Sequence, residues 1–341
     1  MAKDAEQLEN AAANVAVIGA GLSGLVAARR LQDRGCKVTV FEKSRGLGGR
    51  MATRRLDAGL SFDHGAQYFT ARDKKFREQV ESWREGGLVA LWPAEDQKIV
   101  VLKDGHFESE KEAPQRFVGT PTMNAFCKNL ATGLQVHKQT KITRIERTKT
   151  GYQCSSDNDE KFTGFSHVIV SAPAEQTLEL IRGLCSIEDQ VAKIAMNPCW
   201  SGMYSFEARV SPDWVGAFVH DSFLSWAAQN STKPGRKSVY ETLVLHANPE
   251  WTRNNWERDG GEVAADMLSE FWKASKLEPQ IPTDSIGHRW KFAIAKEPAT
   301  EKCFVDQDAG IIACGDWANG SRVEGAFLSG LAAADRLMEF L

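Results

Sequence analysis

The 341-residue chain lacks any run of about twenty apolar residues, the length that a membrane-spanning helix requires. Its seven cysteines include no Cys-x-x-Cys pair, so neither a metal site nor a secreted disulfide framework is indicated. An excess of charge is absent too, because 42 Lys and Arg against 45 Asp and Glu leave a net charge of −3. This balance gives no sign of nucleic acid or an anionic membrane as the main partner.

Residues 1–12 combine charges of both signs and have no apolar core, unlike a secretory signal. Together with a set of reduced thiols, this predicts a cytoplasmic protein that holds no metal ion. The hydrophobic content of 42% is ordinary for a globular protein, and the length indicates two domains. We expect a monomer or a small homo-oligomer.

The most informative feature that is present is a glycine-rich turn near the start. An apolar run over 15–18 leads into Gly19, Gly21 and Gly24, which open a helical pattern over 22–34. In a dinucleotide-binding turn the first glycine allows the tight turn, the second lets a pyrophosphate approach the backbone, and the third lets the helix pack on the strand. The N–H groups and the dipole at the helix start would then face the negative charge.

A second apolar run ends at Glu42, about twenty residues further on, where a carboxylate can accept hydrogen bonds from a ribose. That carboxylate would repel a 2′-phosphate, so NADP is not expected at this site. On these residues alone both FAD and NAD remain open. The segment Gly48-Gly49-Arg50-Met51 follows, and Arg50 lies where an extended FAD would pass its phosphates.

Patterns along the rest of the chain predict a discontinuous cofactor domain. Buried-strand patterns at 168–170 and 310–316 are of the dinucleotide-binding type, whereas 200–210, 215–230 and 238–247 alternate like antiparallel strands. We therefore predict an α/β fold with a Rossmann-like FAD-binding domain and an inserted antiparallel-sheet substrate domain of α+β type. The first would comprise residues 1–72, 118–175 and 292–341, and the second residues 73–117 and 176–291.

Further local predictions concern single elements. We expect a helix over 120–131, because Thr120-Pro121 is a helix start signal, and one continuous strand over 136–147 that pairs with 151–154. The loop at 233–237 is expected to be a solvated turn rather than a contact for substrate phosphates.

Several segments resemble the flavin-containing amine oxidase superfamily and, within it, the bacterial renalases. The superfamily pattern is carried by GAGLSGL with Glu42, by GGRM, by VIVSAP and by GDWANGSRVEGAFLSG. EKSRGLGGRM, DHGAQYFTARD and GHRWKFA extend the likeness to bacterial renalases over almost the entire length. The resemblance implies FAD, bound without a covalent link because the HRW segment at 288–290 contains no cysteine.

The resemblance also implies individual FAD contacts. The glycine turn would hold the pyrophosphate, Glu42 and Lys43 the adenosine ribose, and the segments around Arg50 and His64 the ribityl chain and ring. A reduced flavin is negative near N1, and the start of the last helix would stabilise that charge by about 0.3–2 kcal/mol. The implied set is Gly19, Ala20, Gly21, Leu22, Ser23, Gly24, Glu42, Lys43, Arg50, Met51, His64, Gly65, Ala66, Gln67, Ile142, Ser171, Gly315, Asp316, Arg322, Val323, Glu324, Gly325 and Ala326.

Departures from the amine oxidases argue against a simple amine substrate. Amine oxidases hold the substrate nitrogen between two aromatic rings; Trp290 matches one of them, but Arg322 stands where the other is expected. A fixed cation there repels an ammonium group. The usual active-site lysine also has no obvious counterpart within 196–200.

The likeness to renalases implies oxidation of 2- and 6-dihydro isomers of NAD(P) to NAD(P)+, with hydride passing to flavin N5 and O2 being reduced to H2O2. Because a dihydropyridine already holds a transferable hydride, no acid–base pair is needed, and residues that position the ring become the candidates. They are Gln67, Tyr68, Trp226, His246, Trp290 and Arg322.

Three other functions stay open. An amine or polyamine oxidase of the same superfamily would be reduced by some amine. A carotenoid- or porphyrin-type flavoprotein would need a long apolar tunnel or a membrane-binding surface, which this polar chain does not indicate. A flavin-binding sensor would show no turnover. Trp226 and His246 also have purely structural interpretations, as a core tryptophan and a hydrogen-bonded core histidine.

Overall fold

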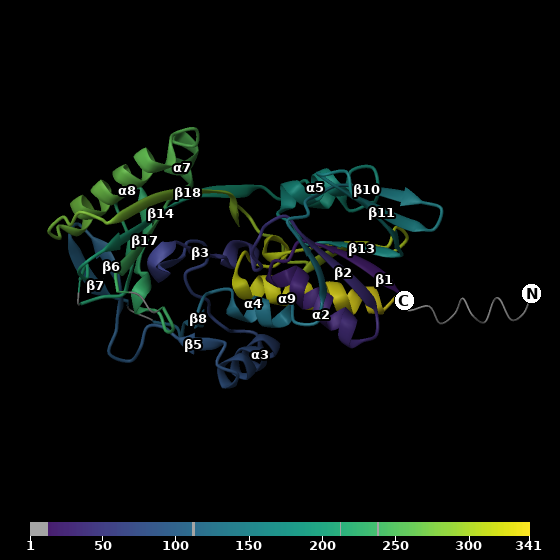
Figure 1. Ribbon diagram of the computed structural model, residues 1–341, viewed down its shortest axis with the longest axis horizontal. Helices are drawn as coiled ribbons and strands as arrows, with labels where there is room; N and C mark the ends of the chain where they lie inside the picture. The colour runs from purple at the N-terminus through teal and green to yellow at the C-terminus, as the bar shows by residue number, and fades with distance from the viewer. Residues whose placement is uncertain (1–12, 111–112, 212, 237–238) are drawn as a thin grey trace, which may run out of the picture. The chain divides into compact units, whose positions relative to one another are not determined.

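The computed structural model describes residues 13–110, 113–211, 213–236 and 239–341 (Figure 1). Residues 1–12, which carry the expectation about a secretory signal, and Lys237 lie outside this part. The chain forms two compact units. Among the described residues, unit 1 comprises those up to Gly49, Cys127–Ala195 and Ala295–Leu341, and unit 2 comprises those of Arg50–Phe126 and Met196–Ile294.

Unit 1 is built on a six-stranded sheet in the order β19-β20-β13-β1-β2-β9. All neighbouring strands run parallel except β19, which is antiparallel to β20. Near-continuous burial, as in β20, is typical of parallel strands covered on both faces. The strands are β1 (Asn14–Ile18), β2 (Lys37–Glu42), β9 (Gln135–Lys138), β13 (His167–Val170), β19 (Cys303–Asp306) and β20 (Ile311–Cys314).

Helices α2 (Leu22–Asp33) and α9 (Val323–Met338) lie side by side in unit 1 (Figure 1). Their close approach depends on Gly330, because a Cβ there would collide with the backbone oxygen of Ser23. The unit also contains helices α5 (Ala174–Ile181) and α6 (Glu188–Val191), the short helix η4 (Asp316–Ala318), and a three-stranded antiparallel sheet of β10 (Ile142–Thr148), β11 (Gly151–Ser156) and β12 (Lys161–Phe165).

Unit 2 contains a seven-stranded sheet in the order β18-β14-β17-β16-β15-β6-β7. The pairs β14–β17, β17–β16, β16–β15 and β6–β7 are antiparallel, whereas β15 and β6 are parallel. The strands are β6 (Ile99–Lys103), β7 (His106–Ser109), β14 (Met196–Phe206), β15 (Gly216–Val219), β16 (Leu224–Gln229), β17 (Glu241–Ala247) and β18 (Asp284–Ala295), the last residue of which belongs to unit 1.

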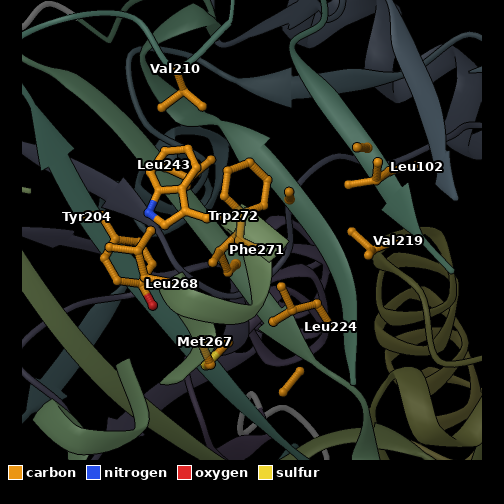
Figure 2. Close-up of a cluster of buried hydrophobic side chains, with 14 of the residues drawn as sticks. Leu102, Tyr204, Val210, Val219, Leu224, Leu243, Met267, Leu268, Phe271 and Trp272 are labelled. Carbon is orange, nitrogen blue, oxygen red and sulfur yellow. The ribbon is translucent and has the colours of Figure 1, made fainter. Parts of the chain in front are cut away.

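Helix α8 (Gly260–Ser275) supplies one side of the core of unit 2. Asp259 starts it by accepting hydrogen bonds from the backbone N–H groups of Gly261 and Glu262. Figure 2 shows Phe271 and Trp272 of this helix beside the sheet residues Tyr204 and Leu243. Burying each such side chain stabilises the fold by about 1.5–3 kcal/mol, so the helix and the sheet hold one another in place.

Shorter elements complete the described structure. They are the hairpin of β3 (Thr53–Arg55) and β4 (Ser61–Asp63), the pair of β5 (Val89–Leu91) and β8 (Phe117–Gly119), the helices α3 (Lys74–Glu85), α4 (Ala125–Leu130) and α7 (Pro249–Asn254), and the short helices η1 (Gly49–Met51), η2 (Asp57–Gly59) and η3 (Asn230–Thr232). Among the described residues no helix has both the length and the apolar composition to cross a bilayer, and no group of three His, Cys, Asp or Glu side chains is arranged to hold a metal ion.

The predicted fold class is confirmed, but two predicted elements are wrong. The strand expected over 136–147 is divided at Gln139, whose φ is 55°: β9 joins the parallel sheet and β10 joins the three-stranded one. Alternation of residues cannot reveal such a change of sheet, because both strands keep period two. The helix expected from 120 begins only at Ala125, because the preceding turn directs the N–H of Met123 to the Asp63 carboxylate, 3.2 Å away.

The boundaries of the two units differ from the boundaries of the predicted domains. Residues 50–72, 118–126 and 292–294 fall in unit 2, and residues 176–195 fall in unit 1. The residues that the resemblance assigns to FAD therefore belong to both units. Which residues form the cofactor domain and which the substrate domain stays a prediction.

Candidate functional site

Different structural constraints act at the three glycines of the turn after β1. Gly19 has φ of 107°, and a Cβ there would lie 2.5 Å from the backbone oxygen of Ser171. A Cβ at Gly24 would collide with the backbone oxygen of Gly19. Gly21 has an ordinary φ of −72°, and a Cβ there would meet nothing within 4 Å. The fold therefore requires Gly19 and Gly24, whereas Gly21 leaves open space beside the backbone.

The open space at Gly21 lies at the start of α2. Gly21 is the N-cap, no side chain caps the helix, and its first turn contains no acidic residue. The first N–H groups of a helix have no partner within the helix, and together with the helix dipole they form an anion-binding end. The second glycine segment lies against this end, since the N–H of Gly48 donates to the oxygen of Ala20 at 2.8 Å.

Glu42 is held beside the same turn at the end of β2. Its side chain is 6% exposed; Oε2 accepts from the N–H of Ala20 at 2.9 Å and Oε1 from the N–H of Ser44 at 2.8 Å. Each oxygen keeps a further lone pair, so the carboxylate can still accept from ribose hydroxyl groups. Lys43 is exposed, and its Nζ donates to Oε1 of Gln176 at 3.3 Å.

The start of α9 is another helix end in unit 1 that no side chain caps. Its N-cap is Arg322, which is exposed and has extended backbone. The approach to the helix is fixed by Asp316, whose backbone oxygen accepts from the N–H of Ser321 at 2.8 Å. Gly325 is required by the fold, because a Cβ there would collide with the backbone oxygen of Asn319.

Unit 1 thus contains the larger part of the implied cofactor set. Ser171 lies against the turn, with its N–H donating to the oxygen of Ile18 at 2.7 Å, and Ile142 is buried in β10. The members in unit 1 are Gly19, Ala20, Gly21, Leu22, Ser23, Gly24, Glu42, Lys43, Ile142, Ser171, Gly315, Asp316, Arg322, Val323, Glu324, Gly325 and Ala326.

The carbonyl group of His64 organises the candidates in unit 2. Its oxygen lies 3.0 Å from Nε1 of Trp290, which donates to it, and 3.1 Å from Nε2 of His246. The next residue, Gly65, is required here, because a Cβ would collide with the backbone oxygen of Arg50 and lie 3.3 Å from the Trp290 ring. The structure therefore brings together five predicted site residues from segments far apart in the sequence: Arg50, His64, Gly65, His246 and Trp290.

The imidazole rings in this group are uncharged near neutral pH. Burial lowers the pKa of His64 and of His246 to about 4 in each case, and it also lowers the pKa of His288. The His64 ring stacks on Trp290 at 4.9 Å and meets the edge of His288 at 4.7 Å. Nδ1 of His64 is buried and has no hydrogen-bond partner among the described residues, so it is available to a polar atom of a ligand.

Tyr68 and Trp226 belong to a second aromatic group in unit 2. Their rings lie 5.4 Å apart, and Trp226 also contacts Phe218 at 4.9 Å. The guanidinium of Arg116 lies 4.9 Å from the centre of the Tyr68 ring. Trp226 is 6% exposed, which fits its interpretation as a core residue, although its Nε1 has no partner within the described part of the chain.

Sequence reasoning missed a buried ionic cluster beside these groups. The loop at 233–237 was expected to be solvated, but the side chains of Lys233 and Arg236 are 0% and 2% exposed, so for these residues the expectation is wrong. The cause is Asp63, a carboxylate distant in sequence that is itself buried and binds both cations. The available signal was an acidic residue at the end of the short strand Ser61–Asp63, because a carboxylate that is buried there must find a partner.

Comparison with known proteins agrees with this architecture. A profile of the NAD(P)-binding Rossmann-like domain family matches residues 17–82. The 4,4′-diapophytoene desaturase (4,4′-diaponeurosporene-forming) of Staphylococcus aureus (strain Newman) is 35% identical over 100 residues, covering 26% of this chain and 20% of the desaturase. The chain therefore spans about a fifth of the length of the curated relatives that it matches.

Two solved structures are similar over almost the whole chain. A protein of Exiguobacterium sp. 255-15 designated a protoporphyrinogen oxidase has a TM-score of 0.73 at 13% identity, with 96% of this chain and 98% of that chain covered. Cyclohexylamine oxidase from Brevibacterium oxydans IH-35A has a TM-score of 0.73 at 13% identity, with 96% and 99% covered. The protein therefore has a Rossmann-like dinucleotide-binding fold combined with an antiparallel-sheet domain, and it shares this overall fold with the two solved structures.

Proposed function

We propose that the protein is a FAD-dependent oxidoreductase that oxidises 2- or 6-dihydro isomers of NAD(P) to NAD(P)+ and reduces O2 to H2O2. The observation that carries the choice of substrate is the charge of the candidate residues. None of the six substrate-positioning candidates is acidic, and Arg322 is a cation exposed to solvent. The buried carboxylate nearest in sequence to Gln67, that of Asp63, is already bound by two cations.

The residues present fit FAD. Gly21 leaves room for a pyrophosphate beside the uncapped start of α2, and Glu42 keeps lone pairs for a ribose. The uncapped start of α9, whose first turn also contains Glu324, offers N–H groups to the negative charge of a reduced flavin, and Nδ1 of His64 has no partner among the described residues. When bound, FAD would supply the chemistry of accepting a hydride and passing its electrons to O2.

The protein's own contribution is to position the reacting ring. The carbonyl of His64 is fixed by two donors, Trp290 and His246, so the Trp290 indole has a defined orientation. A flat, uncharged dihydropyridine would meet no charged ring among the imidazoles of His64 and His246 and the Trp290 indole. A dihydropyridine gives up its hydride without being deprotonated first. These residues would therefore accelerate hydride transfer by holding the ring in the reactive geometry.

An amine oxidase is the alternative with a specific observation in its favour, since the fold is shared with cyclohexylamine oxidase and Trp290 supplies one aromatic ring. An ammonium substrate would, however, find no free carboxylate among the six candidates and would be repelled by Arg322. The likeness to the desaturase covers too little of that protein to indicate an apolar substrate.

The test is anaerobic reduction of the purified, FAD-loaded protein. Borohydride-reduced NAD+, which contains the 2-, 4- and 6-dihydro isomers, should bleach the visible flavin band, whereas enzymatically prepared 4-dihydro-NADH should not. Admission of O2 should restore the band and form H2O2. Bleaching by cyclohexylamine or another member of an amine panel, with none by the isomers, would establish the amine oxidase instead.

A further inference from the structure

The buried carboxylate of Asp63 is the centre of a cluster that links three segments of unit 2. Oδ1 accepts from the hydroxyl of Thr53 at 2.6 Å and from the N–H of Met123 at 3.2 Å. Oδ2 accepts from Nε of Arg236 at 3.1 Å and also from its Nη2. Nζ of Lys233 lies 3.6 Å from the same oxygen.

The cluster contains one more positive charge than negative charge. Arg236 alone satisfies Oδ2 with two N–H groups, and its Nη1 donates to the backbone oxygens of Gly119 at 2.5 Å and Pro234 at 2.6 Å. Within the described ranges, no carboxylate other than that of Asp63 forms an ion pair with Lys233 or Arg236. The Lys233 ammonium is therefore a surplus cation in a site without solvent.

A surplus buried cation opposes folding, because removing an ion from water costs several kcal/mol unless an opposite charge compensates it. Burial accordingly lowers the pKa of Lys233 to about 8, even though Asp63 acts in the other direction. The charge of Arg236 already matches that of Asp63. The other contact that offsets the buried ammonium is the Trp92 ring, whose centre lies 5.3 Å from Nζ, so pairing with Asp63 does not by itself explain the lysine.

Lys233 also orients the side chain of Gln67. Its Nζ donates to Oε1 of Gln67 at 3.2 Å, which turns the amide nitrogen of Gln67 toward the backbone. That nitrogen donates to the oxygen of Gly65 at 3.0 Å and to the oxygen of Asp63. The Gln67 amide, which we expected to face the substrate or the flavin, thus closes the turn that carries His64.

We propose that Lys233 is a positioning residue for FAD, which holds the turn from Asp63 to Gln67 in its binding conformation through the Gln67 amide. It does so at the expense of the stability of the protein without cofactor. The inference rests on the proposed function only in taking FAD as the cofactor, and it is independent of the substrate. We further expect the surplus positive charge of the cluster formed by Lys233, Arg236 and Asp63 to favour the negatively charged reduced flavin over the oxidised form.

The experiment compares four variants with the unmodified protein: Lys233→Met, Lys233→Arg, Gln67→Leu and the double variant of Lys233→Met with Gln67→Leu. Lys103→Met, which removes an exposed lysine from the same unit, is the matched control. Three quantities are measured: the thermal unfolding temperature of the FAD-free protein, the FAD dissociation constant and the reduction potential of the bound flavin.

For Lys233→Met we expect an FAD-free protein at least as stable as the unmodified one, because Arg236 still neutralises Asp63. FAD binding should weaken about tenfold or more. Reduced flavin should be disfavoured about tenfold, which lowers a two-electron potential by about 30 mV. Lys233→Arg should retain the potential, and Lys103→Met should change none of the three quantities. If Lys233 acts through Gln67, the FAD dissociation constant of the double variant should be no larger than the larger of the two values for Lys233→Met and Gln67→Leu.

Two outcomes would overturn the inference. One is a Lys233→Met protein that is clearly less stable without FAD but has an unchanged dissociation constant and potential, since this is the behaviour of a structural lysine. The other is full additivity in the double variant, which would mean that Lys233 does not act through Gln67. Failure of the unmodified protein to bind FAD would refute the proposed function as well, so the two failures are distinguishable.

Discussion

Gly21→Ser should separate the stability of the protein from its affinity for FAD. Gly21 has an ordinary φ of −72°, and a Cβ there meets nothing within 4 Å, so the change introduces no strain. Gly21 is also the N-cap of α2, and serine at an N-cap is more favourable than glycine by a few tenths of a kcal/mol. The protein without FAD should therefore be as stable as the unmodified protein or slightly more stable.

The same substitution should weaken FAD binding. The serine side chain occupies the space left for the pyrophosphate, and its hydroxyl bonds to N–H groups that would otherwise bind the phosphate. A side chain that occupies space needed by the ligand lowers the binding free energy by about 1–3 kcal/mol, which corresponds to an affinity loss of about 5- to 150-fold. Titration of the FAD-free protein with FAD, followed by fluorescence, measures this loss.

Gly24→Ala is the matched control from the same turn. Its Cβ would collide with the backbone oxygen of Gly19, so this variant should be destabilised by about 1–3 kcal/mol in denaturant unfolding without FAD. The reasoning fails if Gly21→Ser binds FAD as tightly as the unmodified protein does. It fails equally if Gly21→Ser loses as much stability as Gly24→Ala.

Three further predictions concern single side chains. Glu42→Gln should cost about 1–3 kcal/mol of stability in urea unfolding, because its amide nitrogen would face a backbone N–H group; unchanged unfolding would contradict the buried geometry. The pKa of His246 is about 4 in the folded protein and about 6.5 in the unfolded protein, so the unfolded state binds more protons between pH 4 and pH 6.5. Stability should therefore fall by up to about 3 kcal/mol as the pH falls from 6.5 to 4, and His246→Gln should reduce that loss in thermal melts. Arg322→Ala should leave FAD bound but slow anaerobic reduction by the dihydro isomers about tenfold, whereas Arg336→Ala at the other end of α9 should not; equal rates would remove Arg322 from the substrate site.

The turn from β1 into α2 could be predicted almost completely from the sequence. Its signals are local: the apolar run, the three glycines and Glu42 lie within about thirty residues, and each acts through backbone sterics or through the nearest strand. The structure adds which glycine serves which purpose. The neighbours of Gly24 and of Gly21 distinguish a glycine required for packing from one that leaves space for a ligand.

The sequence was less informative about unit 2, because the contacts that hold its candidate residues join segments that are distant in the sequence. The carbonyl of His64 binds a tryptophan 226 residues further along the chain, and Asp63 binds Arg236 at a separation of 173 residues. No periodicity or motif encodes a pairing of this kind. The resemblance could name Trp290 as a site residue, but it could not show that the indole donates to the His64 backbone.

The sequence by itself therefore determined the dinucleotide-binding turn, the fold class and the identities of the candidate residues, because these depend on short-range backbone geometry and on residue type. Only the tertiary structure decided how the turn from Asp63 to Gln67 is held. Burial forces each charge and each amide group to find a partner, and the partner available depends on how strands distant in sequence pack together. For that reason Lys233 and Arg236, expected in a solvated loop, lie in the interior of unit 2.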